Sequence, residues 1–283
     1  MITVLEAIKL STDYLEKKSV ESSRANAEIL LAEILKCKRL ELYLSFDKPL
    51  NEIELKQYRE FIKQRGLRIP LQYIIGNVEF YGMKFMVNQN VLIPRPETEL
   101  LVEKIIIENQ NSDNLRILDI GAGSGNISVS LGKHLTNSKV IGIEISKLAI
   151  SVAKQNAALN LVNENVAFVK FDIMSDNLSK LKKFDLIVSN PPYVSENDFA
   201  ELDPELKLHE PTIALTDGND GLTFYKKIIS SVTQLLNPSG KIYFEIGKDQ
   251  HHLIMDMMKD KFTDVKSYKD YSGIDRIVYG VLK

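Results

Sequence analysis

Two hydrophobic patterns divide the chain. Up to about residue 70, apolar residues recur three or four positions apart, as in Val4–Leu15 and Ile29–Leu35. This spacing places them on one face of an α-helix. Glu52–Gln64 repeats it. The pattern predicts a small helical domain over residues 1–70, which serves either to cap apolar surface or to recognise a partner.

Residues 71–93 have a different character. Tyr73–Ile75 and Phe80–Phe85 are rich in β-branched and aromatic residues, and Gly82 lies in the second stretch. These features predict a β-hairpin that links two domains. Pro96 then opens a helical pattern, because proline is favoured at the first position of a helix.

Residues 94–283 alternate between apolar strands and helical patterns. Nearly continuous apolar runs are typical of strands buried on both faces, as in a parallel α/β sheet. The last two strands, joined around Ser272 and Gly273, are expected to form an antiparallel pair at the sheet edge. The predicted strands are Leu115–Gly121, Lys139–Ser146, Val166–Asp172, Phe184–Asn190, Gly240–Gly247, Phe262–Tyr271 and Arg276–Leu282.

Composition narrows the possible functions. The 283 residues carry a net charge of −2, which argues against a dedicated duplex-DNA binder. Cys37 is the only cysteine, so an intrachain disulfide and a cysteine zinc site are excluded, and we expect a buried, inert thiol. The start of the chain does not resemble a secretory signal. No part of the sequence contains an apolar run of transmembrane length. We therefore expect a cytoplasmic protein.

The first predicted strand ends in a glycine-rich turn. Gly121, Ala122, Gly123, Ser124 and Gly125 precede a helical pattern, and such a turn lets a ligand approach the backbone closely. The pattern is G-x-G-x-G, so the dinucleotide fingerprint G-x-G-x-x-G is not met. Either this is only a tight turn, or it binds a cofactor whose carboxylate lies at the helix N-terminus.

Carboxylates end the next two strands. Glu144 can accept hydrogen bonds from both hydroxyls of an adenosine ribose, although it could instead be a surface charge or a helix cap. Asp172 could bind an exocyclic adenine amine and Ile173 could cover the ring, against the alternative of a plain loop.

The fourth strand ends in Asn190, Pro191, Pro192 and Tyr193. The two prolines fix two backbone angles and remove two N–H donors, so the loop presents carbonyl acceptors in a rigid frame. Asn190 adds a side-chain oxygen and Tyr193 a flat ring. We interpret this loop as a site for a planar conjugated NH₂ group rather than as a rigid turn alone.

Such a nitrogen is a poor nucleophile, because its lone pair is delocalised. Holding both N–H groups with Asn190 and the Pro191 carbonyl fixes the nitrogen beside an electrophile. The sulfonium methyl of S-adenosyl-L-methionine fits an adenosine pocket, and S-adenosyl-L-homocysteine would be the product. Methyl transfer depends on positioning and electrostatics and requires no metal. The four histidines form no convincing metal-ligand pattern, and we expect no metal site.

The sequence resembles the HemK-like protein-(glutamine-N5) methyltransferases that modify peptide-chain release factors, over nearly its whole length. The similar segments are 68–76, 91–103, 118–131, 184–194, 209–222 and 244–250. The resemblance implies a helical N-terminal domain, a β-hairpin and a seven-stranded Rossmann-like methyltransferase domain over residues 94–283. It also implies that Gly121–Gly125 and Glu144 bind the cofactor, and that Asn190–Tyr193 hold the glutamine of a Gly-Gly-Gln motif.

Two other functions stay open. An adenine-N6 methyltransferase shares the Asn-Pro-Pro-Tyr loop but needs a nucleic-acid face, which the net negative charge disfavours. A non-enzymatic cofactor-binding assembly protein would have little use for an intact loop of this kind. We expect a monomer whose partner is a class-1 release factor, without specific nucleic-acid or membrane binding.

Overall fold

The computed structural model describes residues 2–283 and divides into two compact units. The first, the helical unit, comprises the chain up to Asn77 together with Asp203–His209. The second, the sheet unit, comprises Val78–Leu202 and Glu210–Lys283. The chain therefore passes between the units at three places.

The helical unit is built on the predicted hydrophobic spacing. Its helices are α1 (Val4–Lys17), α2 (Ser23–Leu35), the 3₁₀ helix η1 (Arg39–Leu44), α3 (Glu52–Gly66), α4 (Leu71–Ile75) and α9 (Pro204–His209). Capping boxes formed by Thr3 with Glu6 and by Asn51 with Glu54 begin α1 and α3, satisfying backbone N–H groups that have no partner inside the helix. The apolar faces of α1, α2 and α3 pack together as one core.

Ion pairs connect the segment Asp203–His209, which is distant in the sequence, to the rest of the helical unit. Arg65 Nη2 lies 2.6 Å from Glu205 Oε1, and Arg68 Nη2 lies 2.9 Å from Asp203 Oδ1. The guanidinium of Arg65 is buried and its Nε also donates to Asn26 Oδ1 at 2.7 Å. Because these partners are far apart in the sequence, hydrophobic periodicity could not predict their contact.

The predicted hairpin is shorter than its β-rich composition suggested. Its strands are β1 (Asn77–Phe80) and β2 (Met83–Met86), whereas Tyr73–Ile75 lie in the helix α4, so their assignment to the hairpin was wrong. Pro70 precedes this helix and Gly76, at φ +84°, ends it. Ile74 and Ile75 pack against the helical core, and this packing overrides their β-propensity.

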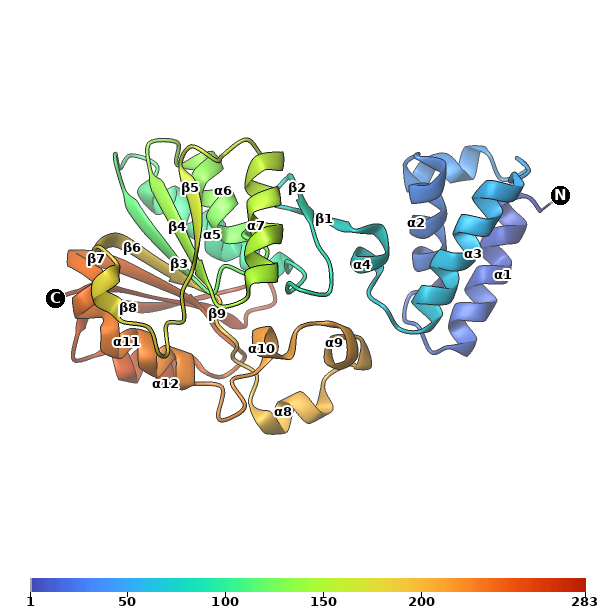
Figure 1. The fold of residues 1–283 in the computed structure, drawn as a ribbon. Helices are drawn as coiled ribbons and strands as arrows, with labels where there is room; N and C mark the ends of the chain where they lie inside the picture. The colour runs from blue at the N-terminus through green and yellow to red at the C-terminus, as the bar shows by residue number, and fades with distance from the viewer. Residues whose placement is uncertain (1) are drawn as a thin grey trace. The chain divides into compact units, whose positions relative to one another are not determined.

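The sheet unit contains seven strands in the order β5-β4-β3-β6-β7-β9-β8 (Figure 1). Strands β3 to β7 are parallel, and β9 is antiparallel to both β7 and β8, which confirms the predicted fold class. The strands are β3 (Arg116–Ile120), β4 (Lys139–Glu144), β5 (Val166–Lys170), β6 (Phe184–Ser189), β7 (Leu236–Glu245), β8 (Phe262–Lys269) and β9 (Asp275–Leu282).

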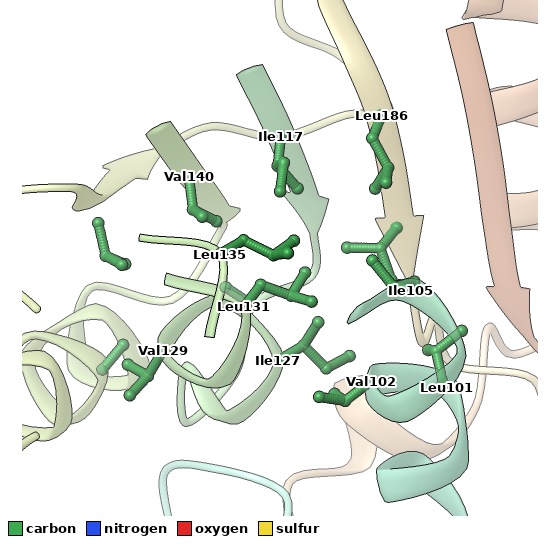
Figure 2. Close-up of a cluster of buried hydrophobic side chains, with 14 of the residues drawn as sticks. Leu101, Val102, Ile105, Ile117, Ile127, Val129, Leu131, Leu135, Val140 and Leu186 are labelled. Carbon is green, nitrogen blue, oxygen red and sulfur yellow. The ribbon is translucent and has the colours of Figure 1, made fainter. Parts of the chain in front are cut away.

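Helices cover both faces of this sheet. On one face α5 (Pro96–Asn109), α6 (Asn126–His134) and α7 (Lys147–Leu159) pack on the strands, and Figure 2 shows apolar side chains of α5 and α6 against β3, β4 and β6. The other face is covered by α11 (Thr223–Leu235) and α12 (His251–Met258). The remaining short elements are η2 (Leu178–Lys180), α8 (Glu196–Glu201) and α10 (Thr212–Leu215).

Strand order fixes the place where a ligand would bind. β3 is followed by β4 on one side and, later in the chain, by β6 on the other, so the connections diverge between β3 and β6. In open α/β sheets, ligands bind beyond the carboxyl ends of the strands at such a point. The glycine turn after β3 and the proline loop after β6 both lie at this edge.

Two smaller expectations concern the chain as a whole. Within residues 2–283, no helix is both long enough and apolar enough to cross a membrane. Cys37 lies just beyond the end of α2, where it is partly buried, and burial raises the pKa of its thiol. A raised thiol pKa lowers the fraction of reactive thiolate.

Candidate active site

The glycine turn connects β3 to α6. Gly121, Gly123 and Gly125 all have positive φ angles, and the N–H groups of Gly121 and Ala122 both donate to the Ile143 carbonyl at 3.0 Å. A Cβ atom added at Gly121 would meet nothing within 4 Å. The turn thus follows a backbone path that suits glycine, and its outer surface is open to a ligand.

Glu144, at the end of β4, lies against this turn. Its Oε2 accepts the Gly123 N–H at 3.0 Å and its Oε1 accepts the Ser146 N–H at 2.9 Å. Each carboxylate oxygen can accept a further hydrogen bond, and the side chain is only partly buried. The carboxylate is therefore fixed in place and still able to accept hydroxyl donors such as those of a ribose.

The residues after β5 are engaged locally. Asp172 Oδ1 accepts the Met174 N–H at 2.8 Å and Oδ2 accepts the Ser175 hydroxyl at 2.7 Å. Ile173 is buried in the apolar cluster that includes Ile143. The proposed contacts of Asp172 and Ile173 with an adenine stay predictions.

The loop Asn190–Tyr193 follows β6 and is held in place by contacts with Gln250 and Gly221. Gln250 Nε2 donates to the Tyr193 carbonyl at 3.0 Å, and its Oε1 accepts the Gly247 N–H at 2.9 Å. Gly221 has φ +75°, and a Cβ there would lie 2.3 Å from the Tyr193 carbonyl oxygen. Glycine is thus required at position 221, where this segment contacts the Asn190–Tyr193 loop. The contact limits movement of the loop toward Gly221.

Tyr193 presents a neutral ring. Burial raises the pKa of its phenol, and the nearby carboxylate of Glu245 adds to the rise. Because the ordinary pKa of tyrosine is about 10, the phenol stays protonated at neutral pH. The ring can therefore pack against a flat group without adding a charge.

The Asn190 side chain meets helix α5. Its Nδ2 donates to the Thr98 hydroxyl oxygen at 3.3 Å, and Thr98 is buried in the first turn of α5. With Nδ2 engaged by the protein, Oδ1 is the end of the amide that can accept an N–H from a ligand.

Two buried carboxyl groups lie at this sheet edge, and neither was predicted as a site residue. Burial raises the pKa of Asp119, on β3, to about 7, and hydrogen bonds from Ser128 oppose the rise. Burial likewise raises the pKa of Glu245, at the end of β7, to about 7. In the sequence, each is a lone acidic residue near the carboxyl end of an apolar strand, and this signal could have identified both.

An ion pair holds the segment before α5. Arg95 pairs with Glu210, whose side chain is 2 % exposed, and Glu210 Oε2 also accepts the Ile93 N–H at 3.1 Å. Arg95 and Glu210 belong to segments 91–103 and 209–222, whose roles the sequence left unassigned. Their contact fixes the start of α5 and thereby the position of Thr98.

Metal ligands are not gathered anywhere in residues 2–283: no group of three or more His, Cys, Asp or Glu side chains could hold an ion. The arrangement offers instead an open glycine turn beside a fixed carboxylate, and a rigid acceptor loop on the neighbouring strand. Such a site can bind a nucleoside-like cofactor and hold a planar amide or amine next to it.

Comparison with known proteins agrees with this geometry. The chain matches family models described as the PrmC N-terminal domain, at residues 6–76, and as a methyltransferase domain, at residues 111–280. It is 40 % identical over 276 residues to a release factor glutamine methyltransferase of Fusobacterium nucleatum, covering 97 % of this chain and 77 % of that protein. A protein of the same description from Geobacter sulfurreducens is 39 % identical, with 98 % and 96 % covered.

A solved structure supports the fold independently. The crystal structure of a methyltransferase from Pyrococcus furiosus superposes with a TM-score of 0.54 at 19 % identity, and the match covers 77 % of this chain and 98 % of that one. At this level of identity the likeness extends to the fold alone.

Proposed function

Because this chain belongs to the release factor glutamine methyltransferase family, we propose that it methylates the side-chain amide nitrogen of the glutamine in the Gly-Gly-Gln motif of class-1 peptide-chain release factors. The methyl donor is S-adenosyl-L-methionine and the reaction takes place in the cytoplasm. The observation that carries the proposal is the loop Asn190–Tyr193, which is rigidly braced beside the open glycine turn.

The residues present suit this cofactor. Gly121 and Gly123 leave room for its amino-acid portion beside the N-terminus of α6, where backbone N–H groups favour a carboxylate. Glu144, fixed by Gly123 and Ser146, accepts hydrogen bonds from the ribose hydroxyls. When bound, S-adenosyl-L-methionine supplies an electrophilic methyl group on a positively charged sulfur.

The protein positions the nucleophile. Asn190 Oδ1 and the Pro191 carbonyl accept the two N–H groups of the glutamine amide, and the Tyr193 ring lies against its plane. Two acceptors raise the electron density on the nitrogen and fix its orientation. Holding reactants in the reactive geometry is a large source of rate enhancement.

Selectivity for one glutamine requires contacts beyond the amide, since free glutamine lacks a protein surface. The helical unit is the second surface available, and basic and acidic residues nearly balance over its first 70 residues. On η1, Leu40 and Leu44 are 78 % and 89 % exposed. Exposed apolar side chains of this size suit a protein partner better than a phosphate backbone.

A transfer assay with radiolabelled S-adenosyl-L-methionine tests this function. The purified chain is incubated with a release factor, with the same factor carrying asparagine in place of the motif glutamine, and with DNA or RNA. The expected result is label in the unaltered release factor only. Label in nucleic acid would favour the adenine-N6 alternative, and absence of label from every substrate would favour a non-enzymatic role.

A further inference from the structure

A buried carboxyl group lies behind the residue proposed to hold the substrate amide. In the parallel pairing of β6 with β7, Ser189 lies opposite Phe244. The residues that follow this pair are Asn190 and Glu245, so the two occupy neighbouring positions at the sheet edge. The side chain of Glu245 belongs to a residue only 2 % exposed, and its Oε2 is buried without a hydrogen-bond partner among the described residues.

Thr98 connects the two groups. Its hydroxyl oxygen accepts from Asn190 Nδ2 at 3.3 Å, and hydrogen bonding from Thr98 and from Asn190 opposes the rise in the pKa of Glu245 caused by burial. Thr98 is itself buried, with 2 % of its surface exposed. Three polar side chains, from α5, from the loop after β6 and from the end of β7, thus form one cluster in which Thr98 and Glu245 are buried and Asn190 is partly exposed.

The protonation state of Glu245 decides the direction of these hydrogen bonds. An ionised carboxylate only accepts, so the Thr98 hydroxyl must donate to it and is left to accept from Asn190 Nδ2. This turns Asn190 Oδ1 toward the substrate. A protonated carboxyl can donate to Thr98 instead, which frees the hydroxyl to donate to Asn190 and favours the opposite orientation of the amide.

The opposite orientation is unproductive. It presents the Asn190 NH₂ group to the NH₂ group of a glutamine amide, and two donors cannot form a hydrogen bond with each other. The shape of an asparagine side chain does not distinguish its oxygen from its nitrogen. Only its hydrogen-bonding partners select one orientation.

We infer that Glu245, acting directly and through Thr98, is a positioning residue that sets the orientation of the Asn190 amide, so that the enzyme holds its substrate productively only when Glu245 is ionised. This inference rests on the proposed function and adds a residue to it. Glu245 acts on the substrate only by way of Asn190, so the methyl transfer itself is unchanged.

Other charged groups near Glu245 also affect its pKa. Glu97 on α5 raises its pKa and Arg276 on β9 lowers it. Burial raises the pKa values of Tyr193 and Tyr225, so both phenols face the site as neutral groups. Burial and these opposing charges leave the pKa of Glu245 at about 7, and a small change in pH therefore alters the population of the productive orientation.

The test compares pH profiles of kcat at saturating cofactor and release factor. Wild-type kcat is expected to rise with a midpoint near pH 7 and to level off above about pH 8. Glu245→Gln introduces an amide that can donate to Thr98 as well as accept from it, so it no longer selects one orientation of Asn190. It should lower kcat at pH 8, by up to roughly the 10- to 100-fold known for outer partners of metal ligands, and should abolish the pH dependence. Glu108→Gln, a change of the same kind on α5 remote from the site, should leave both unchanged.

Thr98 provides a second pair of variants in case Glu245→Gln does not fold. Thr98→Ser keeps the hydroxyl and should retain near-normal kcat. Thr98→Val keeps the shape but removes the hydroxyl, and it should lower kcat clearly more than Thr98→Ser does. Cofactor affinity, measured by calorimetry, should change less than twofold in all of these variants, because none of the substituted groups contacts the glycine turn or Glu144.

A measurement on the free protein separates this inference from the proposed function. In nuclear magnetic resonance spectra, the side-chain amide protons of Asn190 should shift with a midpoint near pH 7 in the wild type and should not titrate in Glu245→Gln. The inference would be overturned if Glu245→Gln left kcat and its pH profile unchanged. It would also be overturned if the Asn190 amide proton shifts of the wild type did not change with pH. Failure of the wild type to methylate any release factor would refute the proposed function alone.

Discussion

The two halves of the site are held in different ways. In the half assigned to the cofactor, backbone N–H groups of Gly123 and Ser146 fix the Glu144 carboxylate. In the half assigned to the substrate, the Asn190 side chain is fixed by another side chain, Thr98, with Glu245 buried behind it. One half depends on the path of the main chain and the other on the direction of side-chain hydrogen bonds.

This difference has a functional consequence. The backbone N–H groups that hold Glu144 do not titrate, so they keep its carboxylate in the same position as the pH changes. A site held through a carboxyl group with a pKa near 7 changes with pH. We therefore expect cofactor binding and turnover to respond differently to mutation and to pH.

The largest effect is expected from Asn190→Ala. Removing the oriented acceptor should lower kcat roughly 10²- to 10³-fold, the usual loss for one hydrogen-bonding group aligned with the reacting centre. Affinity for S-adenosyl-L-methionine should fall much less. Steady-state kinetics and calorimetry measure the two quantities, with Asn111→Ala in an exposed loop as the control. A near-normal kcat would remove Asn190 from the substrate half.

The next effect concerns stability and its pH dependence. Glu245 has a pKa of about 7 in the folded protein against an ordinary value of 4.5, so the folded state binds its proton more tightly than the unfolded state. The stability gained is complete below about pH 4.5, declines as pH rises and is lost above pH 7. The change for this group is about 3 kcal/mol.

Glu245→Gln should remove that pH dependence. The free energy of unfolding of the variant, measured by denaturant titration, should exceed that of the wild type at pH 8. At pH 5 the difference between the two proteins should be smaller or absent. Burial also raises the pKa of Asp119 to about 7. The stability of the variant should therefore still decline in part as the pH rises. Equal changes at both pH values would contradict the raised pKa of Glu245.

A smaller effect is expected in the cofactor half. Glu144→Ala should weaken binding of S-adenosyl-L-methionine by about 1.5–3 kcal/mol, the range for hydrogen bonds to a charged group, and should leave kcat at saturating cofactor nearly unchanged. Glu164→Ala, in an exposed turn of the same unit, is the matched control. Unchanged affinity in calorimetry would exclude Glu144 from ribose binding.

The smallest effect is expected outside both halves. Leu44→Asp on η1 should raise the KM for the release factor about fivefold, equivalent to about 1 kcal/mol, while kcat and cofactor affinity stay constant. Leu161→Asp in the sheet unit alters a side chain of similar exposure, 84 % against 89 %, and should change nothing. Equal KM values for the two variants would argue against recognition through η1.

The sequence predicted the features that depend on local pattern. Apolar runs identified the strands of the sheet, and the glycines after β3 and the prolines after β6 identified the two loops. Local composition failed at Tyr73–Ile75, where packing against the helical core produced a helix. In each successful case the residues that carry the signal lie next to one another in the chain.

Features that depend on distant partners were not predictable. Thr98, Asn190 and Glu245 come from three separate elements, and the pairs Arg95–Glu210 and Arg65–Glu205 join segments more than a hundred residues apart. Each of these residues is ordinary in its own segment. Its role depends on burial and on the orientation of a hydrogen bond, and neither is encoded in local spacing.

The most direct test of the proposed function is to locate the transferred methyl group. A release factor incubated with the chain and S-adenosyl-L-methionine is digested and sequenced by tandem mass spectrometry. The expected result is a single methyl group on the side-chain nitrogen of the motif glutamine, present with the wild type and nearly absent with Asn190→Ala. A methyl group on any other residue, or equal methylation by the two proteins, would contradict the assignment of the Asn190–Tyr193 loop.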